Sequence, residues 1–103
     1  KARSKNEYII ANALYRYGIP YKYEFPYKAV NGRIIHPDFY VFNKNTSQEF
    51  YWEHFGMMDN PEYVANSMMY KINLYKMDDI IIGKNLIVTF SGGKYEFCLG
   101  NLS

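Results

Sequence analysis

Two carboxylates stand inside aromatic-rich runs that otherwise have the pattern of β-strands. Asp38 lies in the run 34–42 and Glu53 in the run 49–56, and a polar, turn-forming stretch separates the two runs. Burying an ionised carboxylate without a partner costs several kcal/mol, comparable to the whole stability of a small domain. Each acid also has a simple structural alternative, since Asp38 after Pro37 could end a turn and Glu53 could blunt a sheet edge. A cation shared by both acids is the simplest reason to keep them.

Two further charged residues fall on apolar faces of predicted helices. Glu7 shares the apolar face of a helix predicted over 4–17, and Lys71 lies in the middle of the apolar arc of a helix predicted over 61–77. The simple alternatives are a capping box with Ser4 for Glu7 and a side chain that reaches along the apolar face to water for Lys71. The charges of three acids and one base compensate one another only if the four side chains lie close together. We therefore expect the four charges to converge on one site.

Three carboxylates around one point favour a hard divalent cation with oxygen ligands, Mg²⁺ or Mn²⁺. Such an ion keeps several waters, binds phosphate oxygens of a substrate and lowers the pKa of water. A lysine beside the ion can contact phosphate as a point charge and orient the attacking water. The residue types therefore indicate metal-assisted hydrolysis of a phosphodiester.

The first half of the chain is predicted to form a helix followed by three antiparallel strands. The helix should end at Gly18, and the alternation of aromatic with polar residues predicts a strand over 21–27. Asn31–Gly32 is a strong hairpin signal. The runs 34–42 and 49–56 complete the predicted meander.

The second half should supply a helix and a strand parallel to one of its neighbours. Pro61 occupies the favoured first position of the helix. The apolar run 85–90 is typical of a strand covered on both faces, and 95–99 could add a C-terminal edge strand. The expected fold is α/β, with a small mixed sheet flanked by two helices.

The length, composition and net charge of the chain restrict the class of protein. A chain of 103 residues with 49% apolar residues is predicted to form one globular domain over 1–103. The net charge of +2 implies no general affinity for polyanions, and no apolar run approaches the ~20 residues of a membrane span. The single cysteine, Cys98, excludes an internal disulfide and favours a reducing, cytoplasmic location. The start at Lys1 suggests a domain that is excised from, or part of, a longer protein.

The dipeptide Pro37–Asp38, followed fifteen positions later by Glu53 near a strand end, resembles the motif of the PD-(D/E)xK nuclease superfamily. Together with the αβββαβ element order, the resemblance to this restriction-endonuclease-like fold covers nearly the whole chain. The segment Glu53-His54-Phe55-Gly56 is similar to versions in nuclease domains of phage, mobile-element, repair and helicase-associated proteins. The resemblance implies a Mg²⁺- or Mn²⁺-dependent deoxyribonuclease that binds DNA. Many nucleases of this fold act as dimers, but the sequence identifies no interface.

The resemblance also implies roles for single residues. Asp38 would be the central metal ligand and Glu53 the second, with the backbone carbonyl of His54 as a further ligand. Glu7 would be the acid from the first helix, which contacts metal through water or completes a second site. The His54 side chain should point to the strand face opposite Glu53, as a packed histidine or, alternatively, with a catalytic or ligand role.

The family's lysine has no counterpart on the strand, because Phe55 stands two residues after the motif glutamate. Some members carry this lysine on the neighbouring helix, and Lys71 is the natural substitute here. The implied catalytic set is Glu7, Asp38, Glu53 and Lys71. If Lys71 does not reach the site, the alternatives are a non-catalytic nucleic-acid-binding or interaction module and a purely structural domain of a larger protein.

Further polar residues of the predicted meander are candidates for substrate contact or for supporting the site. Glu24 could join the acidic site or face solvent, and His36, two residues before Asp38, could approach phosphate or metal. The basic candidates for contact with DNA are Lys22, Lys28, Arg33 and Lys44.

Overall fold

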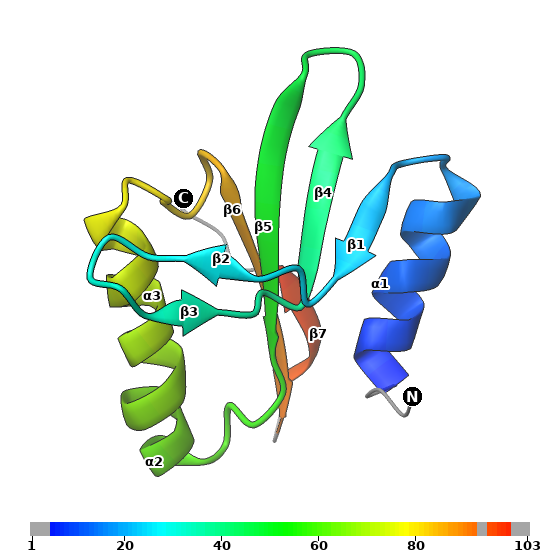
Figure 1. The fold of residues 1–103 in the computed structure, drawn as a ribbon. Helices are drawn as coiled ribbons and strands as arrows, with labels where there is room; N and C mark the ends of the chain where they lie inside the picture. Colours follow the sequence, from blue (N-terminus) through cyan, green and yellow to red (C-terminus); the bar gives the residue numbers. More distant parts are fainter. Residues whose placement is uncertain (1–4, 93–94, 100–103) are drawn as a thin grey trace.

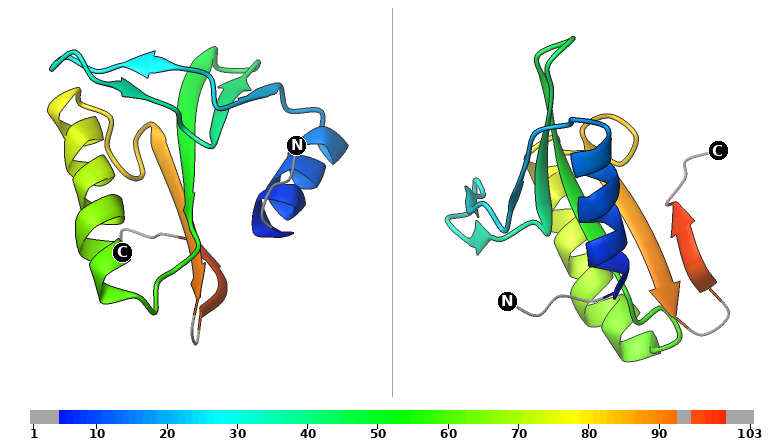
Figure 2. Two further views of the ribbon diagram at one scale, coloured as in Figure 1. Left: turned by 60° about the horizontal axis from the view of Figure 1, so that its bottom comes forward. Right: turned by 90° about the vertical axis from the view of Figure 1, so that its right-hand side faces the viewer.

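The computed structural model (Figure 1) describes residues 5–92 and 95–99. Its elements run in the order α1 (Lys5–Arg16), β1 (Tyr21–Tyr23), β2 (Tyr27–Lys28), β3 (Ile34–Ile35), β4 (Phe39–Asn43), β5 (Gln48–Phe55), α2 (Pro61–Tyr63), η1 (Val64–Met68), α3 (Met69–Met77), β6 (Leu86–Gly92) and β7 (Tyr95–Leu99). A mixed sheet lies between α1 on one face and the α2–η1–α3 helix on the other (Figures 1 and 2). The predicted α/β class with two flanking helices is confirmed.

The main sheet has the strand order β1-β4-β5-β6-β7. β1, β4 and β5 form an antiparallel meander, in which Phe39 pairs with Trp52, and β6 runs parallel to β5. β7 pairs antiparallel with β6 at the edge, as predicted. β6 extends beyond the predicted run 85–90 and continues through Gly92. Gly93 lies outside the described residues.

Two of the predicted strands are each broken in two. The run 21–27 is interrupted where Glu24 has a positive φ of 46° and Pro26 follows, and the run 34–42 is interrupted at Pro37. Proline cannot donate to a strand ladder, which explains both breaks. The short strands β2 and β3 pair with each other in a separate hairpin around Gly32, so the predicted hairpin turn is confirmed.

The first helix packs its predicted face on the sheet. Ile10, Ala11 and Leu14 are buried against Phe39 and Val41 of β4. The helix ends at Arg16, two residues before the predicted glycine, Gly18, which has a φ of +68°. The predicted capping residue, Ser4, lies outside the described residues.

The second helical element is continuous but not uniform. The Asn60 side chain accepts hydrogen bonds from the backbone N–H groups of Glu62 and Tyr63, and Pro61 takes the first helical position, as predicted. The stretch Val64–Met68 is a π-helix, which the sequence did not predict. The face away from the sheet is exposed at Glu62, Asn66, Asn73 and Lys76.

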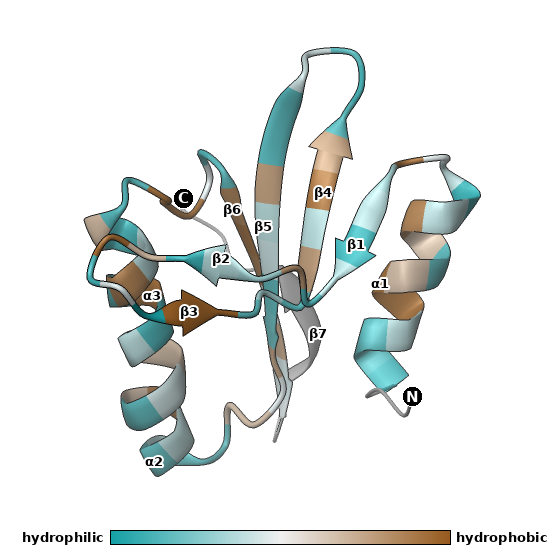
Figure 3. Cartoon of the chain, in the orientation of Figure 1, coloured by the Kyte–Doolittle hydropathy of each residue, from teal (hydrophilic) through white to brown (hydrophobic). Residues whose placement is uncertain are grey.

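Hydrophobic residues form one buried cluster on each face of the sheet. The larger cluster joins the α3 helix to β5 and β6 and includes Ala29 and Ile35 of the hairpin. In Figure 3, β5 shows teal segments beside brown ones although it lies at the centre of the sheet; its polar residues are Gln48, Glu49, Glu53 and His54. No helix among the described residues is long and apolar enough to cross a membrane.

Candidate functional site

The structure brings the four predicted catalytic side chains to one cavity of about 270 Å³. Glu7 comes from the first turn of α1, Asp38 from the link before β4, Glu53 from β5 and Lys71 from α3. Four separate segments therefore converge at one end of the sheet. The remaining lining residues are His54, Phe55, Tyr63 and Ser67.

Glu53 is the most constrained member of the cavity, with a relative exposure of 1%. Its Oε2 accepts a hydrogen bond of 2.6 Å from the Tyr75 hydroxyl, and its Oε1 lies 3.3 Å from the Lys71 Nζ. Burial raises the pKa of Glu53 to about 7; Lys71 and Tyr75 oppose the increase, and the charge of Asp38 adds to it. This carboxyl group is therefore protonated more easily than that of an ordinary glutamate.

Tyr75 is a site residue that was not predicted from the sequence. It is fully buried, and burial together with the neighbouring Glu53 raises the pKa of its hydroxyl far above the usual range. The hydroxyl therefore remains a hydrogen-bond donor that orients Glu53. The available signal was the spacing, because Tyr75 follows Lys71 by one helical turn and shares its face.

Asp38 connects the segment before β4 to β5. The prediction that it lies inside a strand is wrong, because it stands in the link after Pro37, one residue before β4. Its Oδ2 nevertheless accepts a 2.7 Å hydrogen bond from the backbone N–H of His54. The pairing of Phe39 with Trp52 implies that the next position places Asp38 opposite Glu53. The two acids are therefore neighbours, as the sequence predicts.

Lys71 reaches the site from the helix, as expected for a substitute for the strand lysine. Phe55 occupies the position expected for that lysine; it is buried and packs edge-on against Tyr63, with ring centroids 6.4 Å apart. The π-helix lies between Tyr63 and Lys71, where Met69 N–H bonds to the carbonyl of Val64, five residues earlier. Such a turn accommodates one more residue than an α-helical turn and often occurs at functional sites.

The His54 side chain lies on the opposite face of β5, as predicted, and takes part in a buried polar chain. Its Nδ1 is 2.8 Å from the Thr89 hydroxyl and its Nε2 is 3.2 Å from the Ser91 hydroxyl. Trp52 Nε1 donates to Thr89, and Asn6 Nδ2 donates to Ser91. Burial lowers the pKa of His54, and the charge of Glu7 opposes this effect. A neutral imidazole that connects β5 to β6 fits the packed role, and Thr89, Ser91 and Asn6 were not predicted.

The donor set of the cavity fits a hard divalent cation. No three His, Cys, Asp or Glu side chains of the described residues converge closely enough to hold a metal by themselves. Magnesium is usually bound by one or two carboxylates, waters and substrate phosphates rather than by a complete protein cage. Asp38 and Glu53 supply such a pair, and the charge of Asp38 helps to keep the pKa of Glu53 high, an effect that a cation would relieve.

The other predicted contact residues divide into three groups. Lys22, Glu24 and Lys28 are exposed and do not line the cavity. Arg33 and His36 line a neighbouring groove, described below. Lys44 follows β4 and lines a different cavity.

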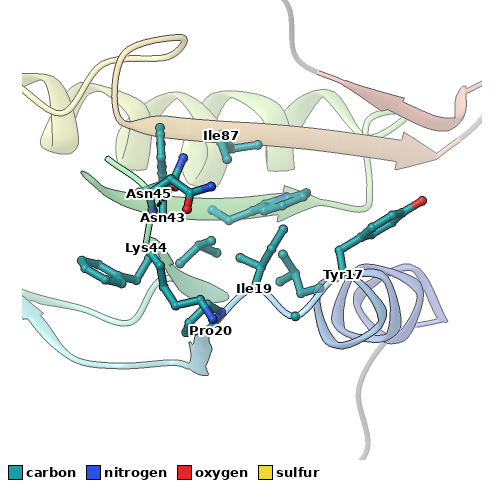
Figure 4. Close-up of a pocket in the computed structure, with 13 residues that line it drawn as sticks. Tyr17, Ile19, Pro20, Asn43, Lys44, Asn45 and Ile87 are labelled. Atoms are coloured by element: carbon teal, nitrogen blue, oxygen red, sulfur yellow. Dashed lines mark hydrogen bonds between the residues drawn. The ribbon is translucent and has the colours of Figure 1, made fainter. Parts of the chain in front are cut away.

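A larger cavity, of about 570 Å³, is not where the carboxylates meet. Lys44 lines it, together with residues from the end of α1 and from β4 and β5 (Figure 4). Its walls are mainly apolar and include Trp52, and no carboxylate or histidine lines it. We therefore place the candidate chemistry in the smaller, polar cavity.

Comparison with known proteins gives little guidance to function. No family model matches the chain, and no solved structure matches it. An uncharacterized protein of Methanocaldococcus jannaschii is 33% identical over 84 residues, which is 82% of this chain. The matched region is 7% of that protein, so the chain spans only a small part of the relative's length.

Proposed function

We propose that this chain is a Mg²⁺- or Mn²⁺-dependent phosphodiesterase that hydrolyses DNA and that it belongs to the PD-(D/E)xK superfamily. The observation that carries the proposal is the 3.3 Å approach of the Lys71 Nζ to Glu53 Oε1, in a cavity that Asp38 and Glu7 also line. Phe55, which stands at the position of the strand lysine, packs against Tyr63. The Lys71 amine comes from the helix instead. The order of α1, a three-stranded meander, a helix and a parallel strand supports the restriction-endonuclease-like assignment.

Each side chain has a task that follows from its surroundings. Asp38 and Glu53 would hold the metal ion, which stabilises negative charge on the phosphodiester and promotes ionisation of water. Lys71 places a positive charge where a phosphate enters the cavity. Tyr75 fixes the orientation of Glu53, and the backbone bond from His54 to Asp38 fixes the second carboxylate. Glu7 lies on the α1 side of the cavity, where it can contact the metal through water.

The test is DNA cleavage by the 103-residue chain over a range of Mg²⁺ and Mn²⁺ concentrations. Supercoiled plasmid, linear duplex, single-stranded DNA and RNA are compared as substrates. We expect Asp38→Asn and Lys71→Met each to reduce the rate by on the order of a hundredfold or more. The matched control is Lys76→Met, which removes a lysine from the exposed face of the same helix. Cleavage that persists in both site variants would show that the hydrolysis occurs elsewhere.

A non-catalytic nucleic-acid-binding module is the second candidate. The observation that favours it is the engagement of both Glu53 oxygens, by Tyr75 and Lys71, in a carboxyl group whose pKa is near 7. A protonated Glu53 is a poor metal ligand. DNA binding without cleavage between pH 7 and 9, at any Mg²⁺ or Mn²⁺ concentration, would support this candidate.

A further inference from the structure

A second groove, of about 350 Å³, adjoins the candidate site. Ser67 and Lys71 line both the groove and the catalytic cavity, so the two spaces meet at the helix. The other wall comes from the end of the β2–β3 hairpin and from the link that leads to Asp38. In Figure 1 this hairpin lies in front of the sheet beside α3. A ligand that fills the groove therefore ends beside Lys71.

The lining of the groove combines cations with an accessible aromatic ring. The cations are Arg33 and Lys71, which line the groove together with His36, and no carboxylate does. Tyr70 has a relative exposure of 44%, and the Arg33 guanidinium carbon lies 5.7 Å from the centre of its ring. Positive charge beside an exposed aromatic face is the combination by which proteins bind single-stranded nucleic acid, because every base offers a face for stacking.

We propose that this groove binds one unpaired nucleotide of a DNA strand next to the scissile phosphate. Arg33 contacts the phosphate of that nucleotide and Tyr70 stacks on its base. The proposal rests on the proposed function and adds the substrate class, which is single-stranded DNA or duplex DNA with a single-stranded end. Its direct test is binding, which does not require hydrolysis.

The preference for an unpaired strand follows from the position of Tyr70. The ring lies on the wall of a groove, and a base reaches it only after leaving the stack of its own strand. Unstacking a paired base costs free energy, whereas a base in a single strand is already accessible. A duplex would contact Arg33 and Lys71 through its phosphates alone. Tyr70 therefore distinguishes the two substrates.

The experiment measures anisotropy of a labelled 12-nucleotide DNA, single-stranded or duplex, in EDTA so that no cleavage occurs. We expect Tyr70→Ala to weaken single-strand binding about 5- to 100-fold and to leave duplex binding unchanged. Tyr70→Phe keeps the ring and should bind as the native chain does. Arg33→Gln should weaken binding and make the dependence of log K on log salt shallower by about 0.7.

Matched controls are Lys76→Gln, which removes a cation from the exposed face of α3 outside the groove, and Tyr15→Ala, which removes an exposed tyrosine from α1. Native-like binding of the single strand by both Tyr70→Ala and Arg33→Gln would overturn the proposal, as would equal losses for single strand and duplex in Tyr70→Ala. If the groove variants lose binding but the native chain cleaves no DNA with Mg²⁺ or Mn²⁺, the proposed function fails and the groove assignment stands. If cleavage is found and the groove variants bind normally, only the groove assignment fails.

Discussion

Replacement of Glu53 by glutamine tests the electrostatics of the site directly. The buried Glu53 has a pKa of about 7, against an ordinary value of 4.5. The folded chain therefore binds this proton more tightly than the unfolded chain does. The resulting stability is fully present below pH 4.5 and is lost as the pH rises through 7. Glutamine has the same shape and no charge, so the variant lacks this loss.

The magnitude follows from the pKa difference of about 2.5 between the folded and unfolded chains. At 1.36 kcal/mol for each pKa unit, the contribution is about 3 kcal/mol. The free energy of unfolding of Glu53→Gln minus that of the native chain cancels the contribution of every titrating group that the two proteins share. We expect this difference to become more positive by about 3 kcal/mol between pH 4.5 and pH 8.

The measurement is urea denaturation followed by circular dichroism in EDTA, at intervals from pH 4.5 to pH 8. Glu62→Gln is the matched control, because Glu62 is exposed on α2 and its substitution should give a nearly constant difference. A difference for Glu53→Gln that does not vary with pH would refute the reasoning. It would mean that Lys71 and Tyr75 offset the burial of the charge completely.

Three further predictions follow from the same contacts. Mg²⁺ should raise the melting temperature of the native chain more at pH 8 than at pH 5, because it binds ionised carboxylates, and a thermal melt of Asp38→Asn should show little of this effect. Tyr75→Phe removes the 2.6 Å hydrogen bond to Glu53 and should cost about 1–3 kcal/mol in urea denaturation, with a further rise of the Glu53 pKa by NMR titration; an unchanged pKa would contradict the orienting role. Gly92→Ala places a Cβ 2.6 Å from the Met58 backbone nitrogen at a φ of +119°, so it should destabilise the fold more than Gly18→Ala, where nothing lies within 4 Å of the added atom. Equal urea midpoints for the two alanine variants would contradict this comparison.

Local chemistry explains why the elements of the fold could be predicted. Asn60 and Pro61 begin the second helix, Gly18 lies just after the end of the first, and each acts through its own backbone or the nearest turn. The alternation in β5 places Glu53 and His54 on opposite faces whatever surrounds the strand. Asp38, Glu53 and Lys71 could be identified as candidates because each interrupts an apolar pattern. These properties depend on neighbours in the sequence, which the chain itself specifies.

The tertiary structure decided which groups touch. The Tyr75 hydroxyl bonds to Glu53 because packing places this part of α3 over β5. The π-helix, which precedes Lys71, changes the direction in which the following side chains point. The breaks at Glu24 and Pro37 separate the hairpin from the sheet and create the groove beside Tyr70. Contacts of this kind join segments far apart in the sequence, so their geometry follows from packing and not from any local pattern. The sequence alone determined that the two carboxylates needed partners. Packing determined that Lys71 and Tyr75 are the partners of Glu53 and that the backbone N–H of His54 bonds to Asp38.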